Sequence, residues 1–240
     1  MTVRVLQSKS EIAEARRSLR VRGVSCLRPV PLPLRVLRRL GFASRAAIGD
    51  RLKSWDVALT ARFVDDHVPH SAKILDLGAY SSELPYVLHA SGYTSLHGID
   101  FDPRLATMPL QEAVHFIRGD FHHAPLRDGS IDAITSISVI EHGYSAEKLF
   151  GEASRLLRPG GYFLASCDYW PEKIDTTDVT LFGVSWTIFS RDEILAMIDA
   201  ARGFDLHPTG PIELDAGDRA IDWNGRNYTF AWLALQKGER

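Results

Sequence analysis

The stretch Lys73-Ile-Leu-Asp-Leu-Gly-Ala-Tyr80 decides the fold of this chain. Its apolar residues are typical of a short buried strand, an acid lies among them, and a glycine ends the run. Residues 82–89 follow with the pattern of a helix. A buried strand that ends on Asp-x-Gly and leads into a helix is typical of nucleotide-binding α/β proteins. The stretch therefore predicts a ligand site at the loop after its strand.

The rest of the chain's body alternates strand and helix. We predict strands at 73–78, 95–100, 114–118, 131–137 and 161–167, and helices at 82–91, 104–108, 145–157 and 190–202. This alternation predicts an α/β fold, a Rossmann-like seven-stranded, mostly parallel sheet with helices on both faces. Two extended runs without an intervening helix, 204–214 and 227–236, predict an antiparallel C-terminal strand pair.

The N-terminal part differs from the body in charge. Residues 1–53 hold 13 lysines and arginines against three acids, a net charge of +10, and the remainder holds 15 against 27, or −12. We predict a basic helical extension over 1–54 and a Rossmann-like domain over 55–240. Helices are expected at 9–22, 34–40 and 48–67, the last with one apolar face made of Leu52, Trp55, Leu59 and Phe63.

Composition excludes several classes of protein. No run approaches the roughly 18 apolar residues of a membrane-spanning helix, and the N-terminus lacks the apolar core of a signal peptide. The two cysteines, Cys26 and Cys167, lie far apart and form neither a disulfide framework nor a zinc motif. We expect a cytoplasmic protein with no transmembrane segment.

Two further acids agree with the first stretch. Asp100 closes the second predicted strand and Asp120 follows the third, as Asp76 lies in the first. Because the carboxyl ends of parallel strands meet at one edge of the sheet, these acids are expected to lie together there. An acid after the second strand is placed to accept both hydroxyls of a ribose. Asp120 is placed to accept from an adenine amino group.

Six segments resemble class I S-adenosylmethionine-dependent methyltransferases, most of all their small-molecule branch, in order and spacing. They are Ile74-Leu-Asp-Leu-Gly78, Gly98-Ile-Asp-Phe-Asp102, Gly119-Asp-Phe121, Leu126-Arg-Asp-Gly-Ser-Ile-Asp-Ala-Ile134, Val139-Ile-Glu-His142 and Leu156-Leu-Arg-Pro-Gly-Gly-Tyr-Phe163. The resemblance covers residues 55–240 and implies S-adenosylmethionine as the cofactor. It implies a cofactor site made of Asp76, Gly78, Ala79, Tyr80, Asp100, Phe101, Asp120, Phe121 and Ser138.

Tyr80 departs from the pattern of that family. The family reads Asp-x-Gly-x-Gly in this loop, and tyrosine replaces the second glycine here. Glycine allows close approach of a ligand and tolerates positive φ, whereas a tyrosine in the left-handed region costs about 1–2 kcal/mol. A ring that packs outward leaves the site open, and a ring that fills it closes the site. A non-catalytic or repurposed protein with a closed cofactor site is therefore an alternative.

The resemblance implies methyl transfer to a small-molecule acceptor, and we expect oxygen as the acceptor atom. A hydroxyl acceptor needs a base, for which the candidates near the sheet edge are His142 and Asp168. Four aromatic residues are candidates for shaping an acceptor pocket: Tyr144, Tyr169, Trp170 and Trp186. We predict no metal site, because the adjacent His122 and His123 point to opposite sides in an extended loop.

The basic N-terminal arm leaves the partners open. Its arginines, within residues 1–45, fit an RNA or a protein substrate, an anionic membrane surface, or the acidic body of the protein. Docking on the acidic body, within the chain or between subunits, is the simpler interpretation. A homodimer is a further option. A nicotinamide-dependent oxidoreductase is disfavoured, because the Gly-x-Gly-x-x-Gly turn that binds a pyrophosphate is missing.

Overall fold

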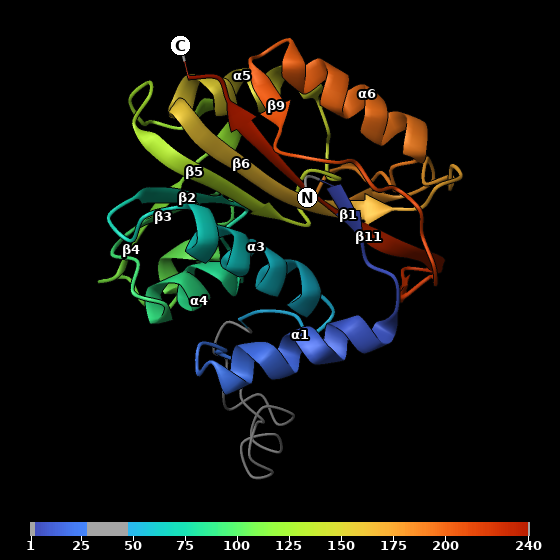
Figure 1. The fold of residues 1–240 in the computed structure, drawn as a ribbon, viewed down its shortest axis with the longest axis horizontal. Coiled ribbons are helices and arrows are strands. Elements are labelled where there is room, and N and C mark those ends of the chain that lie inside the picture. Colours follow the sequence, from blue (N-terminus) through green and yellow to red (C-terminus); the bar gives the residue numbers. More distant parts are fainter. Residues whose placement is uncertain (1–2, 28–47, 240) are drawn as a thin grey trace.

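The structure is a computed structural model that describes residues 3–27 and 48–239 (Figure 1). The helix predicted over 34–40 lies outside the described residues. The strands are β1 (Val3–Val5), β2 (Lys73–Leu77), β3 (Ser95–Asp100), β4 (Val114–Arg118), β5 (Ile131–Ile137), β6 (Leu157–Tyr169), β7 (Thr180–Leu181), β8 (Val184–Ser185), β9 (Leu206–Pro208), β10 (Ile221–Trp223) and β11 (Arg226–Lys237). The helices are α1 (Lys9–Val21), α3 (Ser54–His67), α4 (Leu84–Ala90), α5 (Ala146–Leu156) and α6 (Arg191–Arg202), with the 3₁₀ turns η1 (Pro103–Thr107) and η2 (Phe121–His123).

The central sheet confirms the predicted fold class. Seven strands lie in the order β1-β11-β6-β5-β2-β3-β4, and β9 and β10 each pair with β11. The five strands β6, β5, β2, β3 and β4 run parallel to one another. β11 runs antiparallel to β6 and pairs with β9, which gives the predicted antiparallel C-terminal pair. The carboxyl ends of β2, β3 and β5 therefore share one edge of the sheet.

β1 is a strand that the sequence analysis did not predict. It pairs antiparallel with β11, and Val3 lies opposite Leu233. On its other side, the Val3 N–H donates to the Pro211 carbonyl at 3.3 Å and the Glu213 N–H donates to the Val3 carbonyl at 3.2 Å. The boundary at residue 54 stays a prediction, but residues 3–5 lie within the sheet.

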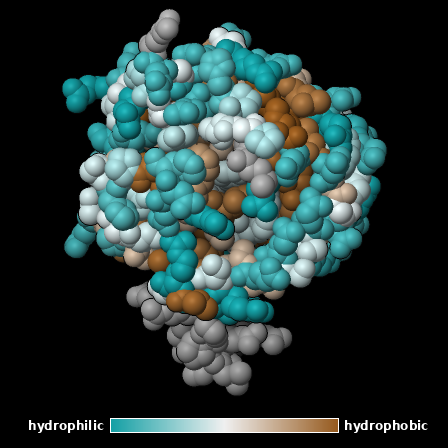
Figure 2. Space-filling model, in the orientation of Figure 1, coloured by the Kyte–Doolittle hydropathy of each residue, from teal (hydrophilic) through white to brown (hydrophobic). Residues whose placement is uncertain are grey.

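Helices cover both faces of the sheet (Figure 1). α5 and α6 pack on one face through a core that includes Phe150, Phe163 and Ile198. α1, α3 and α4 form the layer on the opposite face, whose core includes Trp55 and Trp232. None of the helices in the described residues combines the length and apolar character that crossing a bilayer requires. The face shown in Figure 2 is mostly hydrophilic, with hydrophobic residues gathered near its middle and upper right.

α3 corrects part of the sequence analysis. The helix begins at Ser54, and of the predicted apolar face Trp55 is buried, whereas Leu52 precedes the helix and is 37% exposed. α3 packs against both α1 and the strands β5 and β6, so a broad side of it is covered. The buried residues of α3 are Ser54, Trp55, Asp56, Val57, Thr60, Ala61 and Val64. An acid is therefore buried in this helix, which the apolar spacing did not indicate.

Candidate active site

The loop after β2 crosses the end of β3. The N–H groups of Gly78 and Ala79 both donate to the Ile99 carbonyl, at 3.0 and 3.1 Å. Gly78 has a φ of 69°, and a Cβ at this position would lie 2.3 Å from Cγ2 of Val139. Glycine is therefore required here both by the backbone conformation and by the close approach of the segment that follows β5.

Asp100 fixes this loop from the end of β3. Its Oδ2 accepts from the Tyr80 N–H at 3.0 Å, and its Oδ1 accepts from the Asp102 N–H at 2.8 Å. The residue is 9% exposed. A carboxylate has about four lone-pair sites, so both oxygens can accept further hydrogen bonds. Asp100 is thus held in one orientation with acceptor capacity left for two hydroxyl groups.

The Tyr80 ring packs against the segment that follows β3. The guanidinium carbon of Arg104 lies 4.5 Å from its ring centre, and the ring contacts the small cluster formed by Ala79, Leu105 and Met108. Tyr80 does not adopt positive φ, and its neighbour Ser81 does instead, with a φ of 64°. The strain of the missing glycine therefore falls on a small residue, and the ring is held by η1.

Asp76 is buried in β2. It is 2% exposed, its Oδ1 accepts from Thr135 Oγ1 at 2.7 Å, and its Oδ2 accepts no hydrogen bond from the described residues. Burial raises the pKa of Asp76 to about 7, against smaller opposing effects of the Thr135 and Ser82 hydroxyls. A buried acceptor oxygen without a donor is costly, and it is the atom that an amino group of a ligand would satisfy.

The raised pKa of Asp76 gives a testable pH dependence. The folded protein keeps the Asp76 proton where the unfolded chain has lost it, so this residue makes the protein less stable as pH rises from about 4 to about 7. We expect Asp76→Asn to gain about 2–3 kcal/mol relative to wild type between pH 5 and pH 8, since the difference builds up over about two pKa units and one unit corresponds to about 1.4 kcal/mol. Urea unfolding of both proteins at the two pH values measures this. A stability difference that does not change with pH would contradict it.

The adenine-side residues lie at the ends of β3 and β4. Phe101 follows Asp100 and is 61% exposed. Phe121 is half-buried, and its ring lies 4.4 Å from that of His122. Asp120 accepts from the His122 N–H at 2.9 Å and faces its Nδ1 at 3.0 Å, and these contacts contribute to lowering the pKa of Asp120 against the raising effect of burial. Among the residues that the structure describes, no group of three or more histidines, cysteines or acids could hold a metal ion.

The N-terminal arm docks on the cofactor-side loop. Arg16 of α1 makes two hydrogen bonds of 2.7 Å to the Glu83 carboxylate, and both side chains are buried. The Gly49 N–H donates to the Ser81 carbonyl at 2.7 Å. The simpler interpretation of the basic arm, docking on the chain's own acids, is confirmed for Arg16 and for Arg22, which pairs with Asp65.

A second group of acids lies beside the first. Asp56 of α3, Glu141 after β5 and Asp168 of β6 are 0%, 1% and 4% exposed. Asp56 accepts from Ser166 Oγ at 2.8 Å and from Ser138 Oγ at 3.5 Å. Burial raises the pKa of Asp56 to about 6 and that of Asp168 to about 7, and it raises the pKa of Glu141 as well.

Ser138 ends β5 in a strained conformation. Its φ is 49°, which is uncommon for a residue with a side chain, and such strain is concentrated at functional sites. Its N–H donates to both the carbonyl and the hydroxyl oxygen of Ser166, each at 3.1 Å. These two hydrogen bonds hold Ser138 in the strained conformation, which keeps its hydroxyl near Asp56. The next residue, Val139, packs against the loop that contains Gly78.

The two predicted base candidates lie in different surroundings. Asp168 accepts from the Trp186 indole N–H at 2.8 Å and belongs to the buried acid group. The His142 ring lies 5.2 Å from that of Phe182, and its Nδ1 is buried without a hydrogen-bond partner in the described residues. Burial lowers the pKa of His142 to about 4, so its ring is neutral at pH 7.

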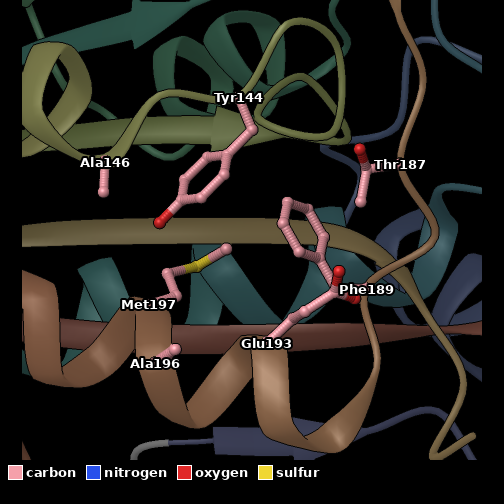
Figure 3. Close-up of a pocket in the computed structure, with 7 residues that line it drawn as sticks. All are labelled: Tyr144, Ala146, Thr187, Phe189, Glu193, Ala196 and Met197. Carbon is pink, nitrogen blue, oxygen red and sulfur yellow. The ribbon is translucent and has the colours of Figure 1, made fainter. Parts of the chain in front are cut away.

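The four aromatic residues predicted to shape an acceptor pocket also lie in different surroundings. Tyr169 is fully buried and donates to the Leu214 carbonyl at 2.7 Å, so it belongs to the core. Trp170 lies under the guanidinium of Arg219, 4.2 Å from its ring centre. Trp186 contacts the acid group. Tyr144 points into a separate cavity of about 280 Å³, which is lined also by Ala146, Thr187, Phe189, Glu193, Ala196 and Met197 (Figure 3).

Comparison with known proteins agrees with this geometry. Residues 75–165 match a family model described as a methyltransferase domain. Over these residues the chain is similar to a methyltransferase domain, and its fold is that of solved S-adenosylmethionine-dependent methyltransferases. The match runs from β2 into β6, so the methyltransferase domain as matched includes Asp76, Asp100 and Ser138 but excludes Asp56 of α3 and Asp168 of β6.

A curated relative is similar in sequence over part of the chain, and solved structures share its fold. A probable S-adenosylmethionine-dependent methyltransferase of Mycolicibacterium smegmatis is 31% identical over 133 residues, which cover 50% of this chain and 49% of that protein. A methyltransferase structure from Methanosarcina mazei has a TM-score of 0.56 at 13% identity and covers 74% of this chain and 98% of its own. A geranyl diphosphate C-methyltransferase of Streptomyces coelicolor, solved with S-adenosyl-L-homocysteine, has a TM-score of 0.55 at 18% identity, covering 81% and 88%. This chain spans less than half the length of the curated relatives that it matches.

Sequence reasoning missed two residues of the candidate site. Asp56 and Glu141 were not predicted, although Glu141 stands in the Val139–His142 segment that carried the resemblance. An acid next to the end of a buried strand was the signal that could have identified Glu141. Asp56 had no such signal, because its burial depends on the contacts of α3 with β6.

Proposed function

We propose that the protein transfers a methyl group from S-adenosylmethionine to a small-molecule acceptor. The observation that carries this proposal is the Asp100 carboxylate, which two backbone N–H groups hold at the end of β3 with its remaining lone pairs available. The cofactor, when bound, supplies an electrophilic methyl group on a sulfonium. The protein's own work is then alignment of the acceptor and removal of its proton.

The cofactor roles follow from the contacts of each residue. Asp100 would accept from the ribose hydroxyls, and Asp120 with Phe121 would border the adenine. Asp76 offers an acceptor oxygen without a partner in the described residues, which suits the amino group of the methionine portion. Gly78 and Ala79 shape the loop beside it.

The direct test is calorimetric titration of the full chain with S-adenosylhomocysteine and S-adenosylmethionine. We expect saturable binding of one molecule per chain in the micromolar range that is common for enzyme ligands. No detectable heat at millimolar ligand would overturn the proposal. That outcome would favour the alternative of a closed cofactor site.

Asp168 is the better candidate for the base. A general base works best when its pKa lies near the operating pH, and burial brings the pKa of Asp168 to about 7. His142, with a pKa of about 4, is a weaker proton acceptor. The assay measures the rate at which S-adenosylhomocysteine forms from S-adenosylmethionine in the presence of a pooled set of small hydroxyl- and amine-bearing molecules. We expect Asp168→Asn to lower this rate by about 100-fold, the usual contribution of a general base. His142→Gln, the matched variant, should cost less, and the reverse order would assign the role to His142.

The arm does not favour an RNA substrate in the described residues. Arg16 is buried against Glu83 and Arg22 is paired with Asp65, so neither is free for a phosphate. Oxygen, the acceptor atom expected from the sequence, is one acceptor atom that this proposed function allows.

A further inference from the structure

The acids beside the cofactor edge form a group that lacks donors. Asp56, Glu141 and Asp168 come from three elements, and Asp168 is the charged residue that most strongly disfavours the ionised form of Glu141. The charge of Asp56 also disfavours the ionised forms of Glu141 and Asp168. We call these three residues the acid triad. Three carboxylates in a water-poor interior are costly unless a positive charge or hydrogen-bond donors compensate them.

The donors that the structure describes leave two oxygens unsatisfied. Asp56 Oδ1 and Glu141 Oε2 are buried and have no hydrogen-bond partner in the described residues. Both residues are at least nine-tenths buried, at 0% and 1% exposure. Lys53 favours the charged form of all three acids but makes no ion pair with them in the described part of the chain. The acid triad therefore has capacity for another donor that carries positive charge.

Aromatic rings border the acid triad. Trp186 donates its indole N–H to Asp168, and its ring lies edge-on to Tyr228 at 5.9 Å and to Trp223 at 5.3 Å. The Tyr228 phenol also interacts with Asp168. Carboxylates next to aromatic rings are the combination that recognises an organic ammonium group, through charge-assisted hydrogen bonds and cation–π contacts.

We propose that the acceptor is a cationic amine whose ammonium group binds to the acid triad, and this inference rests on the function proposed above. The ammonium N–H groups would donate to Asp56 Oδ1 and Glu141 Oε2. Transfer of one ammonium proton to a carboxylate oxygen of the triad would leave a neutral nitrogen with its lone pair. Ser138 follows β5, and its hydroxyl lies 3.5 Å from Asp56. The neighbour of Ser138, Val139, packs against Gly78, so this nitrogen would lie beside the loop that contains Gly78.

The test compares matched charged and neutral probes. Methylammonium with methanol, and 2-phenylethylammonium with 2-phenylethanol, differ in charge at nearly constant size. Each is titrated calorimetrically into the full chain saturated with S-adenosylhomocysteine, whose own binding is measured first. We expect at least one cation to bind about tenfold or more tightly than its neutral partner, roughly the contribution of one charge-assisted hydrogen bond.

Variants assign the preference to the triad. Glu141→Gln and Asp56→Asn keep the side-chain volume and remove a charge, and either should reduce the preference for the cation by about tenfold, as expected for one charged hydrogen bond. Glu147→Gln, an exposed acid in the first turn of α5, is the control and should keep the preference. Wild-type affinity for S-adenosylhomocysteine shows that a variant is folded.

The outcomes separate this inference from the proposed function. Absence of S-adenosylhomocysteine binding overturns the proposed function. Normal S-adenosylhomocysteine binding, with neither cation preferred over its neutral partner, overturns the cationic acceptor alone. A preference that survives in both Glu141→Gln and Asp56→Asn also overturns it, because the cation would then bind elsewhere.

Discussion

Replacing Asp100 with asparagine is expected to weaken S-adenosylhomocysteine binding by about 100-fold or more. A hydrogen bond to a charged acceptor contributes about 1.5–3 kcal/mol, and the ribose would make two of them. Asparagine would also lose a hydrogen bond within the protein. Its amide nitrogen would face one of the two N–H groups, of Tyr80 or Asp102, that now donate to the carboxylate. Calorimetric titration of both proteins measures the loss.

The control for Asp100 lies two residues along the chain. Asp102 pairs with Arg104 at 2.6 Å, and only its backbone N–H contacts Asp100. Asp102→Asn removes the same charge from the same loop and should keep affinity within about threefold, since the Asp102 carboxylate pairs with Arg104 and is not one of the residues proposed to contact the cofactor. Equal losses in the two variants would mean that net charge, and not the ribose contact, determines affinity.

Replacing Arg16 with methionine is expected to destabilise the fold by about 3–5 kcal/mol, the usual cost of leaving one member of a buried ion pair unpaired. Glu83 would remain buried at 2% exposure, without the two guanidinium donors that now bind it. Because Glu83 lies two residues after Ser81, the loop beside the cofactor should loosen as well. Urea unfolding measures the stability, and titration with S-adenosylhomocysteine measures the effect on the loop.

Two further variants test the cause of this loss. Arg17→Met changes the neighbouring exposed arginine of α1 and should alter stability by less than about 0.5 kcal/mol, as is usual for surface substitutions. The double variant Arg16→Met with Glu83→Leu should recover much of the loss, since an apolar pair can replace a buried ion pair. If the double variant is no more stable than Arg16→Met, the lost charge pairing is not the cause.

The parallel part of the sheet could be predicted because each strand carries its own signal. Near-continuous apolar runs that end on an acid or a glycine identified β2 and β3, and Asp100 was predicted from its place at the end of β3. These features depend on residues close together in sequence. The direction of the Tyr80 ring did not follow from them, because it depends on Arg104 and Met108, which come from a different turn.

The acid triad and the arm's contacts could not be predicted for a related reason. Asp56 lies in a helix where an acid normally faces solvent, and it is buried because Ser166 of a distant strand donates to it. Arg16 belongs to a basic run that reads as a solvated surface, and it turns inward because Glu83 lies there. Both depend on partners more than 60 residues away in the sequence.

β1 has a consequence for the order in which the chain can fold. Val3 precedes its partner Leu233 by 230 residues, and Leu233 lies in β11, the last strand of the described residues. The strand cannot pair until β11 has been made and has itself joined β6, so the contact with the greatest separation in sequence forms late. Until then α1 lacks the contacts that β1 provides on its N-terminal side. β1 and β11 thus complete this edge of the sheet together, although they are far apart in the sequence.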